Sequence, residues 1–278
     1  MSAAIQESSR YYNPGVLNTH LLPRAKRIAI YLLPYTKSLD IEDSLEELPF
    51  PVITMRLPFK TAKEDGIFPQ DAGMVVDGVF HTTQKVFREI GSLFNQADLP
   101  KLWGRVRHMI VDRAPDGGSA AVSSTSRDVV TTDRGAVALF GSHGYRTYKL
   151  PDGTLKRLRG LYPNDWTYVL SSHVDHVATL VDESDGVTLF IDEHVDRLLT
   201  RRAFPRGWNI SPVDHGEVQE GVLNLAFLGK RHVLAPERMR STELGERISR
   251  NRRVVYQPQS IVSDYAGAKC RSLLLSLM

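Results

Sequence analysis

Cysteine is almost absent from this sequence: among 278 residues there is one, Cys270. A single cysteine excludes an internal disulfide and cannot form a thiolate zinc site by itself. Three interpretations remain: an inert buried thiol, a thiol prone to oxidation, or a nucleophile that takes a histidine and a carboxylate from elsewhere in the chain. Because free cysteine is among the most buried residue types, the residue considered alone favours the first interpretation.

The sequence also has no long apolar run and little net charge. No stretch approaches the roughly 18 apolar residues that a membrane-spanning helix needs, and residues 2–12 are too polar for the apolar segment of a secretory signal. The formal net charge of +3 is too small to favour nucleic acid or a membrane as partner. With one cysteine and no signal, we expect a cytoplasmic protein. The oligomeric state stays open, a homodimer included.

Short apolar runs alternate with turn residues along the whole chain, and helical patterns are interspersed among them. This mixture predicts an α/β protein, and we expect one domain over residues 1–278 with residues 1–25 as a poorly ordered arm. The expected helices are Gln84–Asn95, Glu193–Thr200 and Thr242–Ser249. The expected strands are 27–33, 52–56, 73–76, 106–111, 128–131, 136–140, 167–170, 177–181, 187–191, 223–228, 232–235 and 254–257.

The neighbours of Cys270 make catalysis more plausible than the cysteine alone does. Lys269 and Arg271 flank it, and two cations favour the thiolate over the thiol. The small residues at 266–268 allow the backbone to approach a ligand closely.

Three further stretches place a polar side chain directly before an apolar strand. His173 and Asp175 precede the strand at 177–181, and their spacing gives them the same facing in an extended chain. Asp71 precedes the strand at 73–76, and Asp116 is followed by two glycines and a strand of small residues. Two carboxylates, a histidine and a thiol suit a planar cation attacked at carbon. A guanidinium is such a group, because acids can bind its nitrogens while the thiolate attacks its carbon.

The order of these stretches resembles the guanidine-modifying penteins: arginine deiminases, dimethylarginine dimethylaminohydrolases and amidinotransferases. Phe-Pro-Gln-Asp at 68–71 resembles the first acidic motif of the family, Asp-Gly-Gly at 116–118 its acid-Gly-Gly motif, and His-Val-Asp at 173–175 its His-x-Asp motif. Gly-Ala-Lys-Cys at 267–270 is similar to the terminal cysteine motif. The length is closest to the dimethylarginine dimethylaminohydrolase type, whereas His-Val-Asp is more like the deiminases.

The resemblance implies a five-bladed α/β propeller of repeated ββαβ modules and a hydrolase that cleaves a C–N bond of arginine or a related guanidine. By this resemblance Cys270 is the nucleophile, His173 the acid and base, and Asp116 a further catalytic residue. Asp71, Asp175 and Gln70 bind the substrate. No metal or organic cofactor is implied.

Several departures keep alternatives open. Gln70 stands where several members have a second acid, Ser119 replaces a common aspartate, and residues 131–166 follow no family pattern. These departures are compatible with a catalytically inactive pentein-like binding module, and an amidinotransferase is a further alternative. Residues 171–176 are also similar to the zinc motif of metallo-β-lactamase-type hydrolases, with Ser171 in place of its first histidine.

Overall fold

The computed structural model of the protein describes most of the chain. The described residues are 15–34, 39–57, 72–96, 99–113, 117–123, 126–132, 134–150, 173–194, 204–257, 269 and 272–278. Four predicted site residues, Gln70, Asp71, Asp116 and Cys270, lie outside these ranges, as does the unmatched segment from residue 151 onward.

The described strands form five small sheets that repeat one pattern. In each, a first strand pairs antiparallel with a second, and the second pairs parallel with a third. In chain order the sheets are β4 (Met74–Val76), β5 (Val79–Thr82) and β6 (His108–Ile110); β7 (Ala120–Val122), β8 (Asp128–Thr131) and β9 (Arg146–Lys149); β10 (Ala178–Glu183), β11 (Gly186–Asp192) and β12 (Asn209–Val213); β13 (Ala226–Phe227), β14 (His232–Pro236) and β15 (Arg253–Gln257); and β16 (Ser272–Ser276), β2 (Arg27–Pro34) and β3 (Val52–Leu57).

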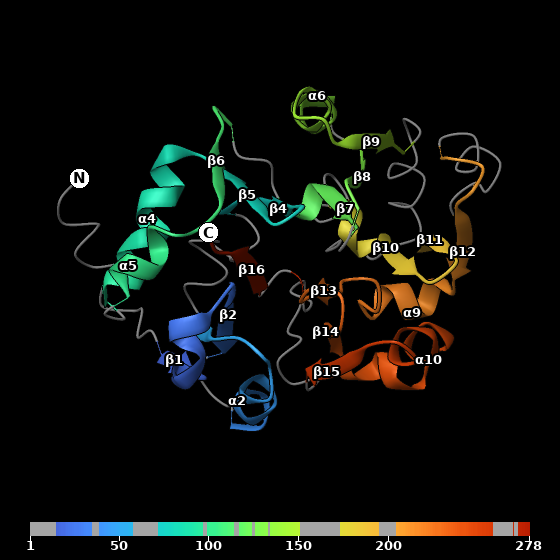
Figure 1. The fold of residues 1–278 in the computed structure, drawn as a ribbon. Helices are drawn as coiled ribbons and strands as arrows, with labels where there is room; N and C mark the ends of the chain where they lie inside the picture. The colour runs from blue at the N-terminus through green and yellow to red at the C-terminus, as the bar shows by residue number, and fades with distance from the viewer. Residues whose placement is uncertain are drawn as a thin grey trace.

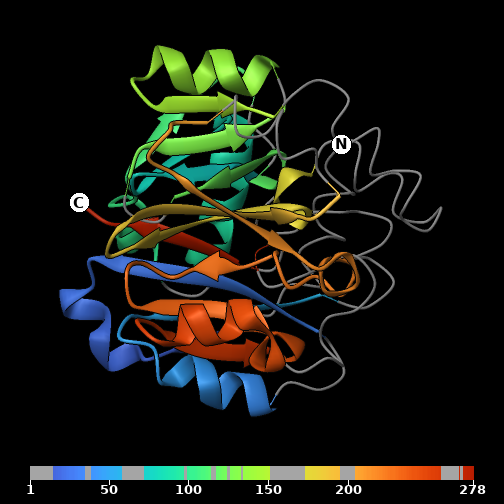
Figure 2. The same cartoon turned by 90° about the vertical axis from the view of Figure 1, so that its right-hand side faces the viewer.

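The five sheets are arranged as a ring. The first strand of each sheet, which we call the inner strand, lies toward the middle in Figure 1, and the helices lie outside. In the side view of Figure 2 the strands run across the molecule, with α6 and α2 at opposite outer edges. Because a parallel pair needs a long crossover, the second and third strands of each sheet are well separated in sequence. This arrangement confirms the predicted five-bladed α/β propeller.

Helices account for several of these crossovers. The helices of the described chain are α2 (Leu39–Glu46), α4 (Gln84–Gln96), α5 (Pro100–Trp103), α6 (Arg134–Ser142), α9 (His215–Gln219) and α10 (Glu243–Ser249). Short 3-10 turns are η1 (Thr19–Arg24), η3 (Gly117–Ser119), η6 (Val174–His176) and η7 (Glu237–Ser241). Within the described ranges, none of the helices combines the length and apolar character needed to cross a membrane.

The ring closes between the two ends of the chain. β16 pairs with β2 from Ser272 opposite Tyr31 to Ser276 opposite Arg27, and the backbone N–H of Leu277 donates to Lys26 at 2.8 Å. Leu273, Leu275 and Leu277 alternate along this segment and are buried in one hydrophobic cluster. The last sheet is therefore built from both termini of the described chain.

The N-terminal segment differs from the expected arm where the structure describes it. β1 (Gly15–Leu17) pairs antiparallel with β3, and the side-chain amide of Asn18 donates to the backbone oxygens of Leu45, Leu48 and Phe50. Residues 15–25 thus contribute to the sheet of β16, β2 and β3 and to its surroundings, whereas residues 1–14 lie outside the described ranges.

One predicted element has the wrong type. We expected a strand at 136–140, but these residues belong to α6. Ala136 and Phe140 are buried and four residues apart, which is the helical spacing. A short apolar run does not distinguish a buried strand from a buried helix. The other expected strands and helices match the structure to within a few residues, except that 167–170 and most of Glu193–Thr200 lie outside the described part.

His81 predicts how stability depends on pH. It is fully buried on β5, where its Nδ1 lies 3.0 Å from the backbone oxygen of Val79. Burial, reinforced by nearby His143, lowers the pKa of His81 below its usual 6.5. The imidazole of His81 therefore binds a proton less tightly in the folded state than in the unfolded state. The free energy of unfolding should fall as the pH drops below 6.5.

We expect His81→Asn to reduce this acid-side loss, because asparagine keeps a donor for Val79 but carries no titrating proton. The measurement is the urea unfolding midpoint from pH 8 to pH 5, with exposed His20→Asn as the matched control. An unchanged pH dependence in His81→Asn would contradict the assignment.

Candidate functional site

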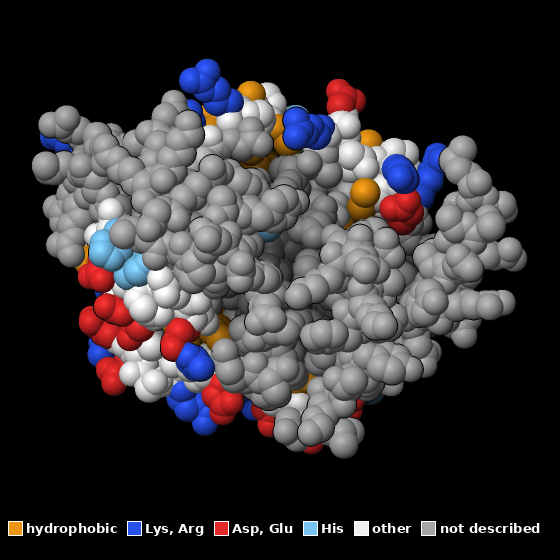
Figure 3. All heavy atoms as spheres, turned by 180° about the vertical axis from the view of Figure 1, so that it is seen from behind, with side chains coloured by type: hydrophobic (Ala, Val, Ile, Leu, Met, Phe, Trp, Pro, Cys, Tyr) orange, Lys and Arg blue, Asp and Glu red, His pale blue; other side chains and the backbone are white. Residues whose placement is uncertain are grey.

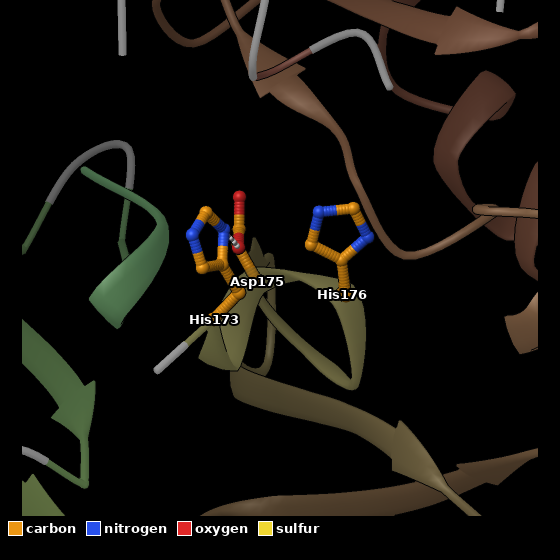
Figure 4. Close-up of side chains that lie close together, drawn as sticks. All are labelled: His173, Asp175 and His176. Atoms are coloured by element: carbon orange, nitrogen blue, oxygen red, sulfur yellow. Dashed lines mark ion pairs between the residues drawn. The ribbon is translucent and has the colours of Figure 1, made fainter. Parts of the chain in front are cut away.

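The described part of the site is built around η6, the turn that precedes β10. His173 has an extended backbone, and Val174–His176 then forms a single 3-10 turn. Asp175 Oδ1 lies 3.7 Å from Nδ1 of His173 (Figure 4). We predicted that the two side chains share one facing because the segment is extended. That reason is wrong, since the turn brings the carboxylate to the imidazole, but the pairing itself is found.

His173 lies against the Gly-Gly motif. A Cβ placed on Gly118 would be 2.2 Å from Nδ1 of His173 and 2.6 Å from its Cε1. Such a distance is far inside van der Waals contact, so the imidazole occupies its position only because residue 118 has no side chain. The glycine that follows Asp116 by two residues thus forms part of the histidine's surroundings.

Asp175 is buried and placed among donors. Only 1% of its surface is exposed. The side-chain amide of Asn224 donates to its Oδ2 at 2.9 Å, and the ammonium of Lys269 lies 3.6 Å from the same oxygen. A buried carboxylate is costly unless it is paired and hydrogen-bonded, and these contacts meet that requirement.

Lys269 connects several blades at once. Its Nζ donates to the backbone oxygens of Gly117 at 3.1 Å and Ala120 at 2.7 Å, in addition to its contact with Asp175. Its backbone N–H donates to Oδ1 of Asn224 at 2.9 Å. The residue before Cys270 is therefore bonded to the residue after Asp116 and lies beside the carboxylate of the His-x-Asp motif.

These residues surround a pocket of about 170 Å³ within the ring. Its lining includes Gly73, Gly117, Asp175, Leu225 and Lys269. Each of these residues precedes an inner strand by only a few positions. The described neighbours of all four sequence motifs thus contribute to one pocket.

In the view from behind, the described side chains are visible mainly around the edge of the molecule (Figure 3). Described acidic and basic side chains are interspersed on this face, without one large patch of a single sign.

His173, Asp175 and His176 could together hold a metal ion, because their ligand atoms lie within 4.8 Å of one another. Figure 4 shows the two imidazoles on either side of the carboxylate. The surroundings fit a cation poorly, since Asp175 already accepts from Asn224 and lies beside the Lys269 ammonium. Among the described residues, the cluster also contains three ligand side chains at most, without the fourth that closes a structural zinc site.

Sequence reasoning missed two parts of this site. Asn224 falls inside the expected strand 223–228, in a segment that resembles the penultimate strand pair of the penteins, but the sequence assigned it no role; the structure places it two residues before β13. Lys269 was noted only as a charge beside the thiol, and its bonds to Gly117 and Ala120 span about 150 positions of chain.

The ring of five sheets with a central pocket is the pentein propeller fold. No protein-family model matches the sequence, and no curated protein matches it. Solved structures of similar fold do match. One is an arginine dihydrolase from the ornithine-ammonia cycle in cyanobacteria, in the form of its substrate-bound N-terminal domain. The match covers 90% of this chain and 98% of that domain, with 13% sequence identity to this chain and a TM-score of 0.54.

The chain spans only 41% of the longer cyanobacterial arginine dihydrolase chain. It is also similar to the dimethylarginine dimethylaminohydrolase of Pseudomonas aeruginosa in complex with citrulline, at 15% identity and a TM-score of 0.53 over 90% of this chain and 99% of that one. At these identities the likeness shows the fold. The alternative of a metallo-β-lactamase-like protein does not agree with this propeller fold.

The contact of Gly118 with His173 generates a test. We expect Gly118→Ala to displace the imidazole and to lower kcat for any reaction at this site by about 100-fold, since a misplacement of about 1 Å can cost that much. The matched control is Gly207→Ala, because a Cβ at Gly207 meets nothing within 4 Å. Steady-state kinetics of both variants provide the measurement, and equal activity would show that His173 does not act from this position.

Proposed function

We propose that this protein is a hydrolase that cleaves a C–N bond of a guanidinium group, in arginine or a related small guanidine, through a covalent intermediate on Cys270. One observation carries the proposal. Lys269, directly before Cys270 in sequence, is bonded to Gly117, directly after Asp116, and lies beside Asp175 of the His-x-Asp motif. Consecutive Cα atoms are about 3.8 Å apart, so these contacts support a site at which nucleophile, acid and histidine meet.

The proposed reaction begins with attack of the Cys270 thiolate on the guanidinium carbon. Asp71, Asp116 and Gln70 hold the guanidinium nitrogens, and Lys269 and Arg271 favour the thiolate. The C–N bond to the leaving group breaks as His173 gives it a proton, and ammonia or an amine departs. A thiouronium remains bonded to the sulfur.

In the second half of the reaction water replaces the sulfur. His173, now neutral, takes a proton from water as the water attacks the same carbon. The C–S bond breaks, the hydroxyl of the intermediate loses its second proton to solvent, where the released ammonia or amine takes it up, and a ureido product leaves with the thiolate and the protonated His173 restored. Two solved structures of the same fold support these steps by likeness: one is described as covalently bonded to a reaction intermediate, and another as bound to product.

Asp175 has two proposed roles, to bind a substrate nitrogen or to tune His173. Its Oδ1 faces the imidazole, whereas Oδ2 accepts from Asn224 beside the Lys269 ammonium. This arrangement favours the second role, in which the carboxylate orients the imidazole and stabilises its protonated form.

The same chemistry with an amine in place of water would give an amidinotransferase. We propose the hydrolase because two solved structures of similar fold are those of hydrolases, an arginine dihydrolase and a dimethylarginine dimethylaminohydrolase. We further propose that the chain acts as one domain in the cytoplasm, where a single reduced cysteine persists.

We expect Cys270→Ser to lower kcat by about 10⁴-fold with every guanidine that the native protein accepts, because the hydroxyl is a far weaker nucleophile at neutral pH. His173→Gln should lower it by about 10²- to 10⁴-fold, the usual contribution of a general acid and base. Release of ammonia, amine and ureido product from a panel of guanidines provides the measurement.

His176→Gln separates this mechanism from the zinc alternative. His176 has no role in the thiouronium reaction, so kcat should stay within about tenfold of the native value, the cost of a modest repacking. Stoichiometric zinc, with activity lost both on chelation and in His176→Gln, would contradict the cysteine mechanism. Full turnover in Cys270→Ser would contradict it equally. A native protein without turnover would favour the inactive binding module.

A further inference from the structure

Asn224 is a fully buried side chain with two different bonds. Its Nδ2 donates to Oδ2 of Asp175, and its Oδ1 accepts from the backbone N–H of Lys269, each at 2.9 Å. It lies two residues before β13, whereas Asp175 precedes β10 and Lys269 precedes β16. A single amide therefore joins three blades of the ring.

The chemistry of the amide group suits this position. A carboxylate needs a donor and a backbone N–H needs an acceptor, and a primary amide presents one of each on the same rigid plane. These two partners also fix which end of the amide is oxygen and which is nitrogen. A leucine of similar size could fill the space but could satisfy neither partner.

The backbone at Lys269 is held from two directions. Asn224 binds its N–H, while its side chain reaches across to the backbone oxygens of Gly117 and Ala120. Asn224 also holds the carboxylate that faces His173. The same side chain thus connects the segment that leads to Cys270 with the group that orients the histidine.

We propose that Asn224 is a positioning residue, which sets the placement of Cys270 relative to His173 through the Lys269 backbone and Asp175. This inference rests on the proposed function. Asn224 acts through its two partners, so its loss should affect the chemical step more than substrate binding. Reactions between held groups are sensitive to small displacements, and about 1 Å can cost about 100-fold in rate.

The test compares Asn224→Leu with Thr188→Val. Thr188 is also fully buried and hydrogen-bonded, to Glu183, but it lies at the far end of β11 from η6. We expect Asn224→Leu to lower kcat by at least about 100-fold with KM within about threefold, and Thr188→Val to leave both nearly unchanged. Equal kcat in Asn224→Leu and the native protein would overturn the proposal. A higher KM with unchanged kcat would overturn it as well.

Two readouts do not depend on turnover. Cys270 is the only thiol of the chain, so the rate of its alkylation by iodoacetamide, followed from pH 5 to pH 9, reports on this residue alone. Hydrogen exchange of the Lys269 amide reports on the bond to Asn224. We expect Asn224→Leu to change the alkylation profile and to speed this exchange, with no change in Thr188→Val.

A pair of variants tests the geometry itself. Asn224→Asp alone places two buried carboxylates together, and their repulsion should move the side chain at 224 away from Asp175 and from the Lys269 N–H, with the same defects as Asn224→Leu. Adding Asp175→Asn exchanges donor and acceptor between the two positions and leaves an oxygen for the Lys269 N–H. We expect the double variant to recover slow exchange at Lys269, whereas kcat stays low because His173 loses its charged partner. Failure to recover slow exchange would overturn the proposed bonding.

These outcomes keep the two proposals distinguishable. If the native protein turns over guanidines but Asn224→Leu is fully active, the positioning role fails alone. If the native protein turns over none, the proposed function fails, and the alkylation and exchange measurements decide whether Asn224 controls the thiol. Unchanged alkylation and exchange in Asn224→Leu would overturn the positioning role in that case as well.

Discussion

The bonds of Lys269 are the interactions on which the rest of this site depends. Its ammonium donates to the backbone oxygens of Gly117 and Ala120 in one blade and lies beside Asp175 of the next. Its backbone N–H donates to Asn224 of a third blade, and the chain after it continues into β16. The ammonium is matched by one carboxylate and two backbone oxygens in a largely buried setting, where such bonds are stronger than in water. They hold the starts of four inner strands at one end of the ring.

The fold explains why the described neighbours of motifs so far apart in sequence line one pocket. Each motif precedes an inner strand, and the sheets repeat one pattern around the pocket, so the residues before successive inner strands meet at the same end. Closure of the ring by β16 against β2 completes this arrangement, because it brings the C-terminal motif beside residues that precede it by about 150 positions. The catalytic proposal therefore depends on ring closure as well as on the residues themselves.

Much of this could be predicted from sequence, because polar residues before apolar strands are visible without a structure. The pairing of His173 with Asp175 was expected, although through an extended segment rather than the η6 turn. The helix at α6 was not, since five apolar residues in a row carry no clear period. Asn224 was missed because its partners are 45 and 49 positions away, and no local pattern encodes such contacts.

The central claim is that Cys270 forms a bond to a guanidinium carbon, and intact-mass spectrometry of acid-quenched turnover mixtures tests it most directly. The proposed mechanism predicts an adduct whose added mass is that of the guanidine minus its leaving ammonia or amine. The adduct should map to the peptide that contains Cys270 and should be absent from Cys270→Ser. Turnover of a guanidine at full rate with Cys270 unmodified at every quench time would exclude the covalent mechanism.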